Sequence, residues 1–120
     1  MELAERHIVI TGAGSGIGRA LARRMAAEGP RAIVVADLDE QAAREVAGEL
    51  GAVAVATDVG KQAEVRALVA RAQELHGPID LFCSNAGVPG PSGGPEASDE
   101  QWQRTWEINV MAHVWAARAR

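Results

Sequence analysis

Four glycines fall within the eight residues from Thr11 to Gly18, TGAGSGIG, directly after the apolar run that begins at His7. Glycine inside a helix or strand costs roughly 0.5–1 kcal/mol relative to alanine, so the bare backbone must serve another purpose here. Glycines permit positive φ and let phosphate oxygens approach backbone N–H groups closely. A helix that begins at such a turn adds the favourable end of its dipole. The stretch is therefore a candidate phosphate-binding turn.

Alternating strands and helices must position this turn. Apolar runs predict strands over residues 7–11, 31–37, 53–58 and 79–84. Helical spacing of apolar residues predicts helices over 17–28, 39–50, 61–76 and from 98 to the last residue, with Gly29-Pro30, Gly51 and Gly77-Pro78 as stops. Apolar residues recur at helical spacing at Ile17, Ala20, Leu21 and Met25, lie on one face at Ala43, Val46, Ala47 and Leu50, and point inward at Val65, Leu68, Val69 and Ala72. A wide apolar stripe, which we expect to be a packing face or a subunit interface rather than a substrate cage, is formed by Trp102, Trp106, Val110, Val114 and Trp115.

The predicted strands are apolar throughout rather than alternating, which is typical of strands buried on both faces of a parallel sheet. We therefore expect an α/β fold, a doubly wound, Rossmann-like parallel sheet, within one domain over residues 1–120. In such a sheet the turn after the first strand is where a dinucleotide phosphate binds. Ser98 and Gln101 fit a capping box for the last helix, and residues 88–95 form a proline- and glycine-rich loop.

Composition excludes several classes of function. The net charge is −4 with no basic cluster, so we expect neither nucleic acid nor an anionic membrane as a partner. A single cysteine, no bilayer-length apolar run and no signal-peptide pattern favour a cytoplasmic location. We expect no metal site, because Cys83 reads as a core residue and His7, His76 and His113 are scattered.

The glycine spacing is Thr11-Gly12-x-x-x-Gly16-x-Gly18 rather than Gly-x-Gly-x-x-Gly. With this spacing the chain resembles the N-terminal part of the short-chain dehydrogenase/reductase family, in its ordinary short branch. The extended branch, which includes nucleotide-sugar epimerases, typically has Gly-x-x-Gly-x-x-Gly. The alternative reading is a glycine-rich turn without a ligand.

Two carboxylates extend the resemblance. Asp37 lies 19 residues beyond Gly18, where a carboxylate accepts the ribose hydroxyls of adenosine and repels a 2′-phosphate. Ser15 is not the basic residue often found before Gly16 in enzymes that prefer NADP, so the expected cofactor is NAD. The resemblance implies that Asp58, with Val59, holds the adenine ring. Asp37 could instead be a turn or cap residue, although Asp39 is the better cap, and Asp58 could cap the helix at Lys61.

The Ser84-Asn85-Ala86-Gly87 motif resembles the family's Asn-Ala-Gly, except that Ser84 replaces the more usual Asn. The resemblance implies that Asn85 steadies the sheet and that Asn109 takes part in catalysis by anchoring a water; Asn109 could also be a satisfied polar residue of the helix. The cofactor-binding residues implied are Thr11, Gly12, Ser15, Gly16, Ile17, Gly18, Asp37, Leu38, Asp58, Val59, Asn85, Ala86 and Gly87.

The family's reaction also uses a Ser and a Tyr-x-x-x-Lys motif, whereas this chain has no Tyr and only Lys61 as lysine. A hydride transferred to a ketone leaves an alkoxide that needs a proton donor. We therefore expect a dehydrogenase truncated after the fourth strand and the following helix, inactive alone. Its longer parent would be an NAD-dependent, homo-oligomeric oxidoreductase for a secondary alcohol or ketone. The alternative is a non-catalytic NAD(H)-binding module or redox sensor.

Overall fold

A parallel sheet forms the centre of the molecule. The structure is a computed structural model that describes residues 1–119. The strands are β1 (His7–Thr11), β2 (Ala32–Asp37), β3 (Val53–Ala56) and β4 (Leu81–Cys83), in the order β3-β2-β1-β4, and every pair is parallel. The crossover from β3 over to β4 makes the sheet doubly wound, which confirms the predicted α/β fold.

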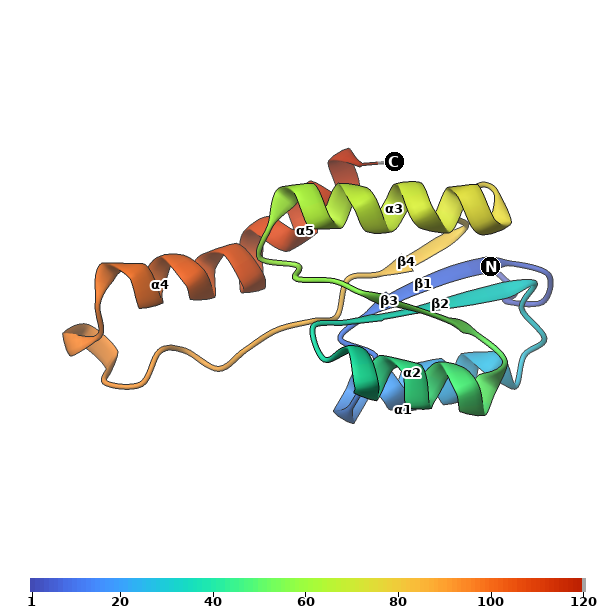
Figure 1. Cartoon of the computed structure of the whole chain (residues 1–120), viewed down its shortest axis with the longest axis horizontal. Coiled ribbons are helices and arrows are strands. Elements are labelled where there is room, and N and C mark those ends of the chain that lie inside the picture. Colours follow the sequence, from blue (N-terminus) through green and yellow to red (C-terminus); the bar gives the residue numbers. More distant parts are fainter. Residues whose placement is uncertain (120) are drawn as a thin grey trace.

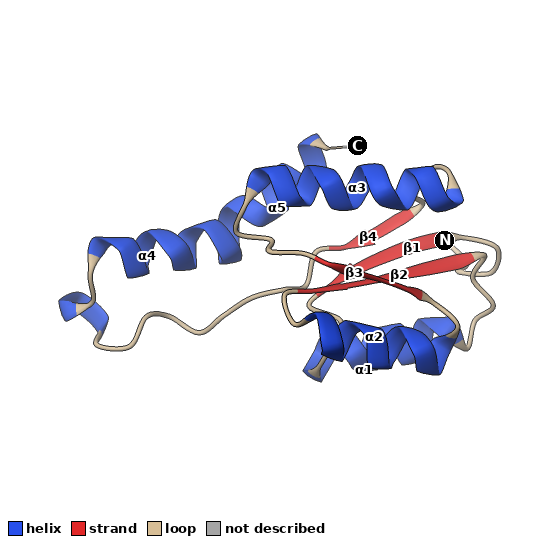
Figure 2. Ribbon diagram, viewed as in Figure 1, coloured by secondary structure: helices blue, strands red, loops and turns tan. Residues whose placement is uncertain are grey.

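Helices cover both faces of the sheet (Figures 1 and 2). The helices are α1 (Gly16–Ala26), α2 (Glu40–Leu50), α3 (Gln62–His76), α4 (Asp99–Trp106) and α5 (Ala112–Arg118). One face carries α1 and α2, and the other carries α3 with α5 beside it (Figure 1). A short 3₁₀ turn (Gly94–Glu96) precedes α4, which projects beyond the sheet as an arm. No helix within residues 1–119 is long and apolar enough to cross a bilayer.

Each face of the sheet has its own hydrophobic core, because successive side chains of a strand point to opposite faces. Ile8 and Ile10 of β1 pack toward α1 and α2, whereas Val9 packs toward Leu68 and Ala72 of α3. The inward faces expected for α2 and α3 are confirmed: Ala43, Val46, Ala47, Val65, Leu68, Val69 and Ala72 are buried, and Leu50 packs against the core.

The apolar residues that recur at helical spacing in α1 do not all face the sheet. Ile17 is 76% exposed and Ala20 is also exposed, while the buried residues of α1 are Gly18 and Ala22. Gly18 touches the backbone of the preceding turn so closely that its position fixes the rotation of the helix. The glycine contact, rather than the largest apolar side chains, therefore selects the face of α1 that meets the sheet.

The last predicted helix is helical throughout but irregular. A π-helical turn (Glu107–Met111) separates α4 from α5. The predicted Ser98–Gln101 capping box is present, with the Gln101 N–H 3.2 Å from Ser98 Oγ and the Ser98 N–H 2.9 Å from Gln101 Oε1.

The predicted apolar stripe of this helix lies largely at the surface of the described chain, and its role as a packing face or subunit interface stays a prediction. Trp102 and Trp106 are 48% and 53% exposed, and the buried residues are Ile108 and Ala112. A π turn takes in an extra residue and so rotates the contact face. The α4 arm also projects past the sheet (Figure 1), and Trp102 contacts the preceding 3₁₀ turn, where its Nε1–H donates to the Gly94 carbonyl at 3.1 Å.

Candidate functional site

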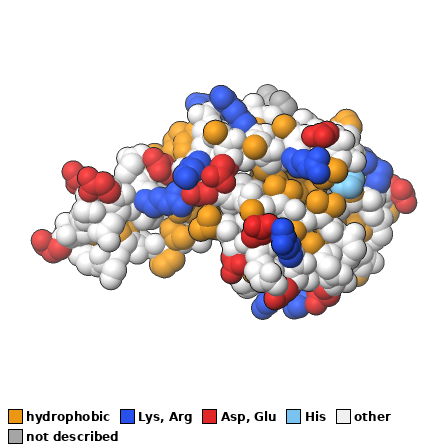
Figure 3. Space-filling model, viewed as in Figure 1, with side chains coloured by type: hydrophobic (Ala, Val, Ile, Leu, Met, Phe, Trp, Pro, Cys, Tyr) orange, Lys and Arg blue, Asp and Glu red, His pale blue; other side chains and the backbone are white. Residues whose placement is uncertain are grey.

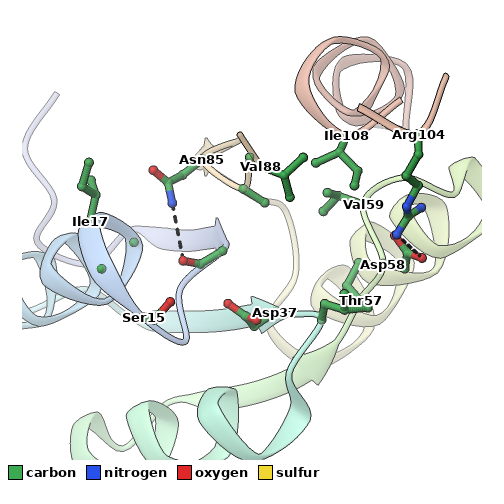
Figure 4. Close-up of a pocket in the computed structure, with 16 residues that line it drawn as sticks. Ser15, Ile17, Asp37, Thr57, Asp58, Val59, Asn85, Val88, Arg104 and Ile108 are labelled. Carbon is green, nitrogen blue, oxygen red and sulfur yellow. Dashed lines mark hydrogen bonds and ion pairs between the residues drawn. The ribbon is translucent and has the colours of Figure 1, made fainter. Parts of the chain in front are cut away.

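A pocket lies at the carboxyl edge of the sheet, where ligands bind in doubly wound folds. Its volume is about 440 Å³. Figure 4 shows its walls: the β1–α1 turn, the ends of β2 and β3, the segment after β4, and the α4 arm. The lining residues are Gly12, Ser15, Gly16, Ile17, Gly18, Asp37, Leu38, Thr57, Asp58, Val59, Asn85, Ala86, Gly87, Val88, Arg104 and Ile108. Twelve of the thirteen residues predicted to bind the cofactor are thus brought together, and Thr11 lies buried behind them.

The glycines of the β1–α1 turn have different tasks. Gly12 has φ 66°, and a Cβ there would lie 2.8 Å from the Cα of Ala86. A Cβ on Gly18 would overlap the carbonyl oxygen of Gly12. Gly16 also has positive φ, 54°, but no atom lies within 4 Å of the place its Cβ would take. Gly12 and Gly18 therefore serve packing, whereas Gly16 faces open space at the pocket.

Ser15 occupies the N-cap position of α1, yet its side chain makes no capping hydrogen bond. Serine at this position usually accepts a bond from the helix's own N–H groups. Here the hydroxyl and the first N–H groups of α1 are left for another acceptor. Together with open Gly16 they form a cradle that suits a phosphate.

Asp37 connects the end of β2 to the glycine turn. Its Oδ2 accepts the Gly14 N–H at 2.9 Å and its Oδ1 accepts the Asp39 N–H at 3.0 Å. Asp39, not Asp37, caps α2, with Oδ1 3.1 Å from the Ala42 N–H. Asp37 therefore makes turn hydrogen bonds, and its carboxylate also lines the pocket, so the ribose-binding role stays a prediction.

Thr11 and Asn85 join β1 to the segment after β4. The Thr11 hydroxyl oxygen accepts the N–H groups of Asn85 at 3.0 Å and Ala86 at 3.2 Å. The Asn85 amide donates to the Thr11 carbonyl at 3.1 Å. These bonds hold the Asn-Ala-Gly segment against the glycine turn, and the role of Asn85 in steadying the sheet stays a prediction.

Asp58 is not the cap of α3, because Lys61 occupies that position. Instead, Arg104 of α4 donates to Oδ1 and Oδ2 of Asp58 at 2.9 and 3.0 Å, as the dashed lines in Figure 4 show. The Gly60 N–H also donates to Oδ1 at 2.9 Å. The carboxylate is thus fixed at the pocket wall by an ion pair with a distant helix.

Asn109 lies in the π turn, and its side-chain amide is engaged by one residue of the pocket wall. Oδ1 accepts the Val88 N–H at 2.9 Å, and Nδ2 donates to the Val88 carbonyl at 2.8 Å. One turn later, His113 Nδ1 and Ser84 Oγ share a hydrogen bond of 2.6 Å. The helix is therefore tied twice to the segment after β4, and π turns are frequent at functional sites.

The sequence suggested that the three histidines are scattered, but the structure brings two of them together. The rings of His7 and His76 meet edge to face with centroids 5.2 Å apart, and both Nε2 atoms are buried without a partner. Burial lowers the pKa of His76, and nearby His7 and Arg31 lower the same pKa further. Among residues 1–119 no three metal-binding side chains cluster. Cys83 packs against the core, where burial raises the pKa of its thiol.

Sequence reasoning missed five functional candidates: Gly14, Thr57, Val88, Arg104 and Ile108. Gly14 was only a variable position of the motif, but a Cβ there would lie 3.0 Å from the Asp37 carboxylate. Arg104 pairs with a residue 46 positions earlier, which no local pattern reveals. Its place five residues before Asn109, on the same helix, is the only signal that could have found it.

Comparisons with known proteins identify the family of the chain. The family model for short chain dehydrogenase matches residues 6–120. A curated relative is 1-deoxy-11-beta-hydroxypentalenate dehydrogenase of Streptomyces exfoliatus, 42% identical over 99% of this chain and 46% of that protein.

Solved structures resemble the chain equally well. A short chain dehydrogenase/reductase of Burkholderia phymatum in complex with NAD has a TM-score of 0.92 and 38% identity over 99% of this chain and 44% of that one. A blue fluorescent protein from a metagenomic library, in complex with NADPH, has a TM-score of 0.88 and 32% identity over 99% of this chain and 51% of that one. The chain spans about half the length of the proteins it matches. With nearly all its residues inside the family model, the chain belongs to the short-chain dehydrogenase/reductase family.

Proposed function

We propose that these residues bind a nicotinamide adenine dinucleotide for a short-chain dehydrogenase/reductase that oxidises a secondary alcohol or reduces a ketone. The observation that carries the proposal is the pocket itself, which joins an open glycine turn at the α1 N-terminus to the Asp37 carboxylate. Relatives named as dehydrogenases, and solved relatives bound to NAD or NADPH, support it. The bound dinucleotide would accept or supply the hydride.

Each wall has a part in binding. The pyrophosphate would lie against the α1 N-terminus, beside Ser15 and Gly16, where N–H groups and the helix dipole favour an anion. Asp37 would accept the adenosine ribose hydroxyls, and Asp58 would face the adenine ring with Val59. Asn85 would keep Ala86 and Gly87 close to the glycine turn, which leaves room for the cofactor.

Catalysis would need residues beyond this chain. A general acid must protonate the alkoxide, and the chain contains no Tyr for that role. We therefore place turnover in a longer, homo-oligomeric protein of the cytoplasm and expect the 120 residues alone to be inactive. Asn109 has its amide engaged by Val88, so its side chain would act by holding the pocket wall. A water anchored at Asn109 stays a prediction.

The cofactor preference is the test of this proposal. We expect NAD to bind more tightly than NADP, because the Asp37 carboxylate repels a 2′-phosphate. Hydrogen bonds to a charged group contribute about 1.5–3 kcal/mol, so Asp37→Ala should weaken the affinity for NAD by roughly 10- to 150-fold. The difference between the NAD and NADP affinities should then become smaller. Calorimetric titration of both dinucleotides measures the two affinities.

The matched control is Asp39→Asn. Asparagine caps a helix as well as aspartate does, so this variant removes a neighbouring charge and keeps the fold of α2. It should leave the NAD affinity unchanged. Equal NAD and NADP affinities in the unmutated chain would contradict the preference, and no binding of either would contradict the proposed function.

A further inference from the structure

The ion pair between Asp58 and Arg104 uses most of the carboxylate. A carboxylate has about four acceptor sites on its two oxygens. Nη2 of Arg104 donates to both Oδ1 and Oδ2, and the Gly60 N–H also donates to Oδ1, so two donor groups make three hydrogen bonds to Asp58. The remaining acceptor site is on Oδ2. The side chain of Asp58 is only 12% exposed, so this site belongs to the pocket wall rather than to open solvent.

Gly60 makes room for the guanidinium. A Cβ on Gly60 would overlap Nη1 of Arg104 and would lie 3.1 Å from Cγ1 of Ile108. Gly60 has no positive φ, so its backbone conformation does not require glycine. A side chain at this position would instead occupy the space that the Arg104 guanidinium fills.

We propose that Arg104 is a positioning residue for the base of the cofactor. By fixing Asp58 through both oxygens, it leaves one acceptor on Oδ2 for the 6-amino group of adenine. Its positive charge also balances the largely buried carboxylate, which would otherwise keep only the neutral Gly60 N–H as a partner. The inference rests on the proposed function and adds that a residue of α4 selects adenine over bases without an amino group.

A purely structural role is the competing explanation. Arg104 could simply tie the α4 arm to the start of α3, as surface pairs do. In that case its loss would lower stability and weaken every dinucleotide by the same factor. The ratio of affinities for two bases separates these explanations, because a change in folding cancels in the ratio.

The experiment compares NAD with nicotinamide hypoxanthine dinucleotide, which carries a carbonyl in place of the 6-amino group. Competition titrations by ligand-observed NMR on the 120-residue chain give both affinities. We expect the unmutated chain to prefer NAD, and Arg104→Gln to reduce that preference roughly tenfold. Arg104→Lys should give an intermediate ratio, because the ammonium keeps the charge but its more flexible side chain holds the carboxylate less firmly than the planar guanidinium does.

Two further variants complete the design. Gly60→Ala keeps both charges but displaces the guanidinium, so it should lower the adenine preference like Arg104→Gln. Arg23→Gln breaks a comparable pair outside the pocket, with Glu49 at 2.7 and 2.9 Å, and should leave the ratio unchanged.

An unchanged ratio in both Arg104→Gln and Gly60→Ala, with NAD still bound by the unmutated chain, would overturn the positioning role alone. Failure of the unmutated chain to bind either dinucleotide would overturn the proposed function and this inference together.

Discussion

Two walls of the same pocket are built by different means. The wall from the β1–α1 turn is made of backbone in contact with backbone, with Gly12 and Gly18 leaving no space for a side chain. The wall from the α4 arm is held by side chains, through Arg104 to Asp58 and Asn109 to Val88. Figure 3 shows the consequence for shape: the arm stands apart from the body, with charged side chains of both signs where they meet.

The difference teaches where each wall is sensitive. Added atoms disrupt the glycine wall, because its parts already touch. Deleted atoms disrupt the arm wall, because a few polar groups hold it in place. The predictions below test this contrast from the largest expected effect to the smallest.

Gly16→Val should abolish measurable NAD binding while the chain stays folded. The valine side chain would project into the open space assigned to the pyrophosphate. Positive φ makes the substitution cost about 1–2 kcal/mol, which lowers the melting temperature without unfolding the chain. Calorimetry and circular dichroism measure the two effects. Retained NAD binding would count against the phosphate cradle.

Gly18→Ala should instead damage folding. Its methyl group would overlap the Gly12 carbonyl oxygen, and overpacking of this kind costs about 1–3 kcal/mol in the free energy of unfolding. The control is Gly48→Ala in the last turn of α2, where a Cβ meets nothing and should stabilise the fold by up to about 1 kcal/mol. Urea denaturation compares the two variants. Similar midpoints would mean that the glycine wall is looser than described.

Asn109→Ala should loosen the arm wall by about 1 kcal/mol, because two partly solvated hydrogen bonds to Val88 are lost. The amide proton of Val88 should then exchange faster with solvent, which NMR detects at that residue. Gln103→Ala removes a bond to Glu107 on the surface of the same arm and serves as the control. Unchanged exchange at Val88 would show that the wall does not depend on Asn109.

The free energy of unfolding should depend on pH through His76, which lies outside both walls of the pocket. The pKa of His76 lies below its ordinary 6.5 in the folded chain, so the unfolded chain takes up the proton first as the pH falls. The free energy of unfolding should therefore decline as the pH drops below about 6.5. His76→Gln should reduce that decline. Denaturation at pH 8 and pH 5.5 measures it, and an unaltered slope in the variant would exclude His76 as its source.

The contrast between the walls also explains what the sequence could predict. The order of strands and helices, the parallel sheet and the faces of α2 and α3 follow from apolar periodicity, which is a local signal. The positions of the Gly12–Gly18 turn and of Asp37 could be predicted from the spacing of these residues along one β–α–β unit. Each of these features depends on residues close together in the chain.

Features set by distant contacts were not predictable. The face of α1 depends on Gly18 meeting Gly12, which outweighs the apolar Ile17. The π turn around Asn109 has no residue pattern that distinguishes it from an α-helix. The contact between His7 and His76 joins residues that are far apart in the sequence. Arg104 looked like an ordinary charged residue of a helix until the fold placed it on Asp58.

The position of the pocket along the chain bears on how the protein is made. Chains leave the ribosome from the N-terminus, and every pocket residue lies between Gly12 and Ile108. The strands β1, β2 and β3 can pair with one another before β4 exists, and β4 then adds to the free side of β1. Under the proposed function, a dinucleotide that binds once Ile108 has left the ribosome would favour the folded form by mass action. Cofactor supply during translation would thus influence how much of the nascent protein reaches its native state.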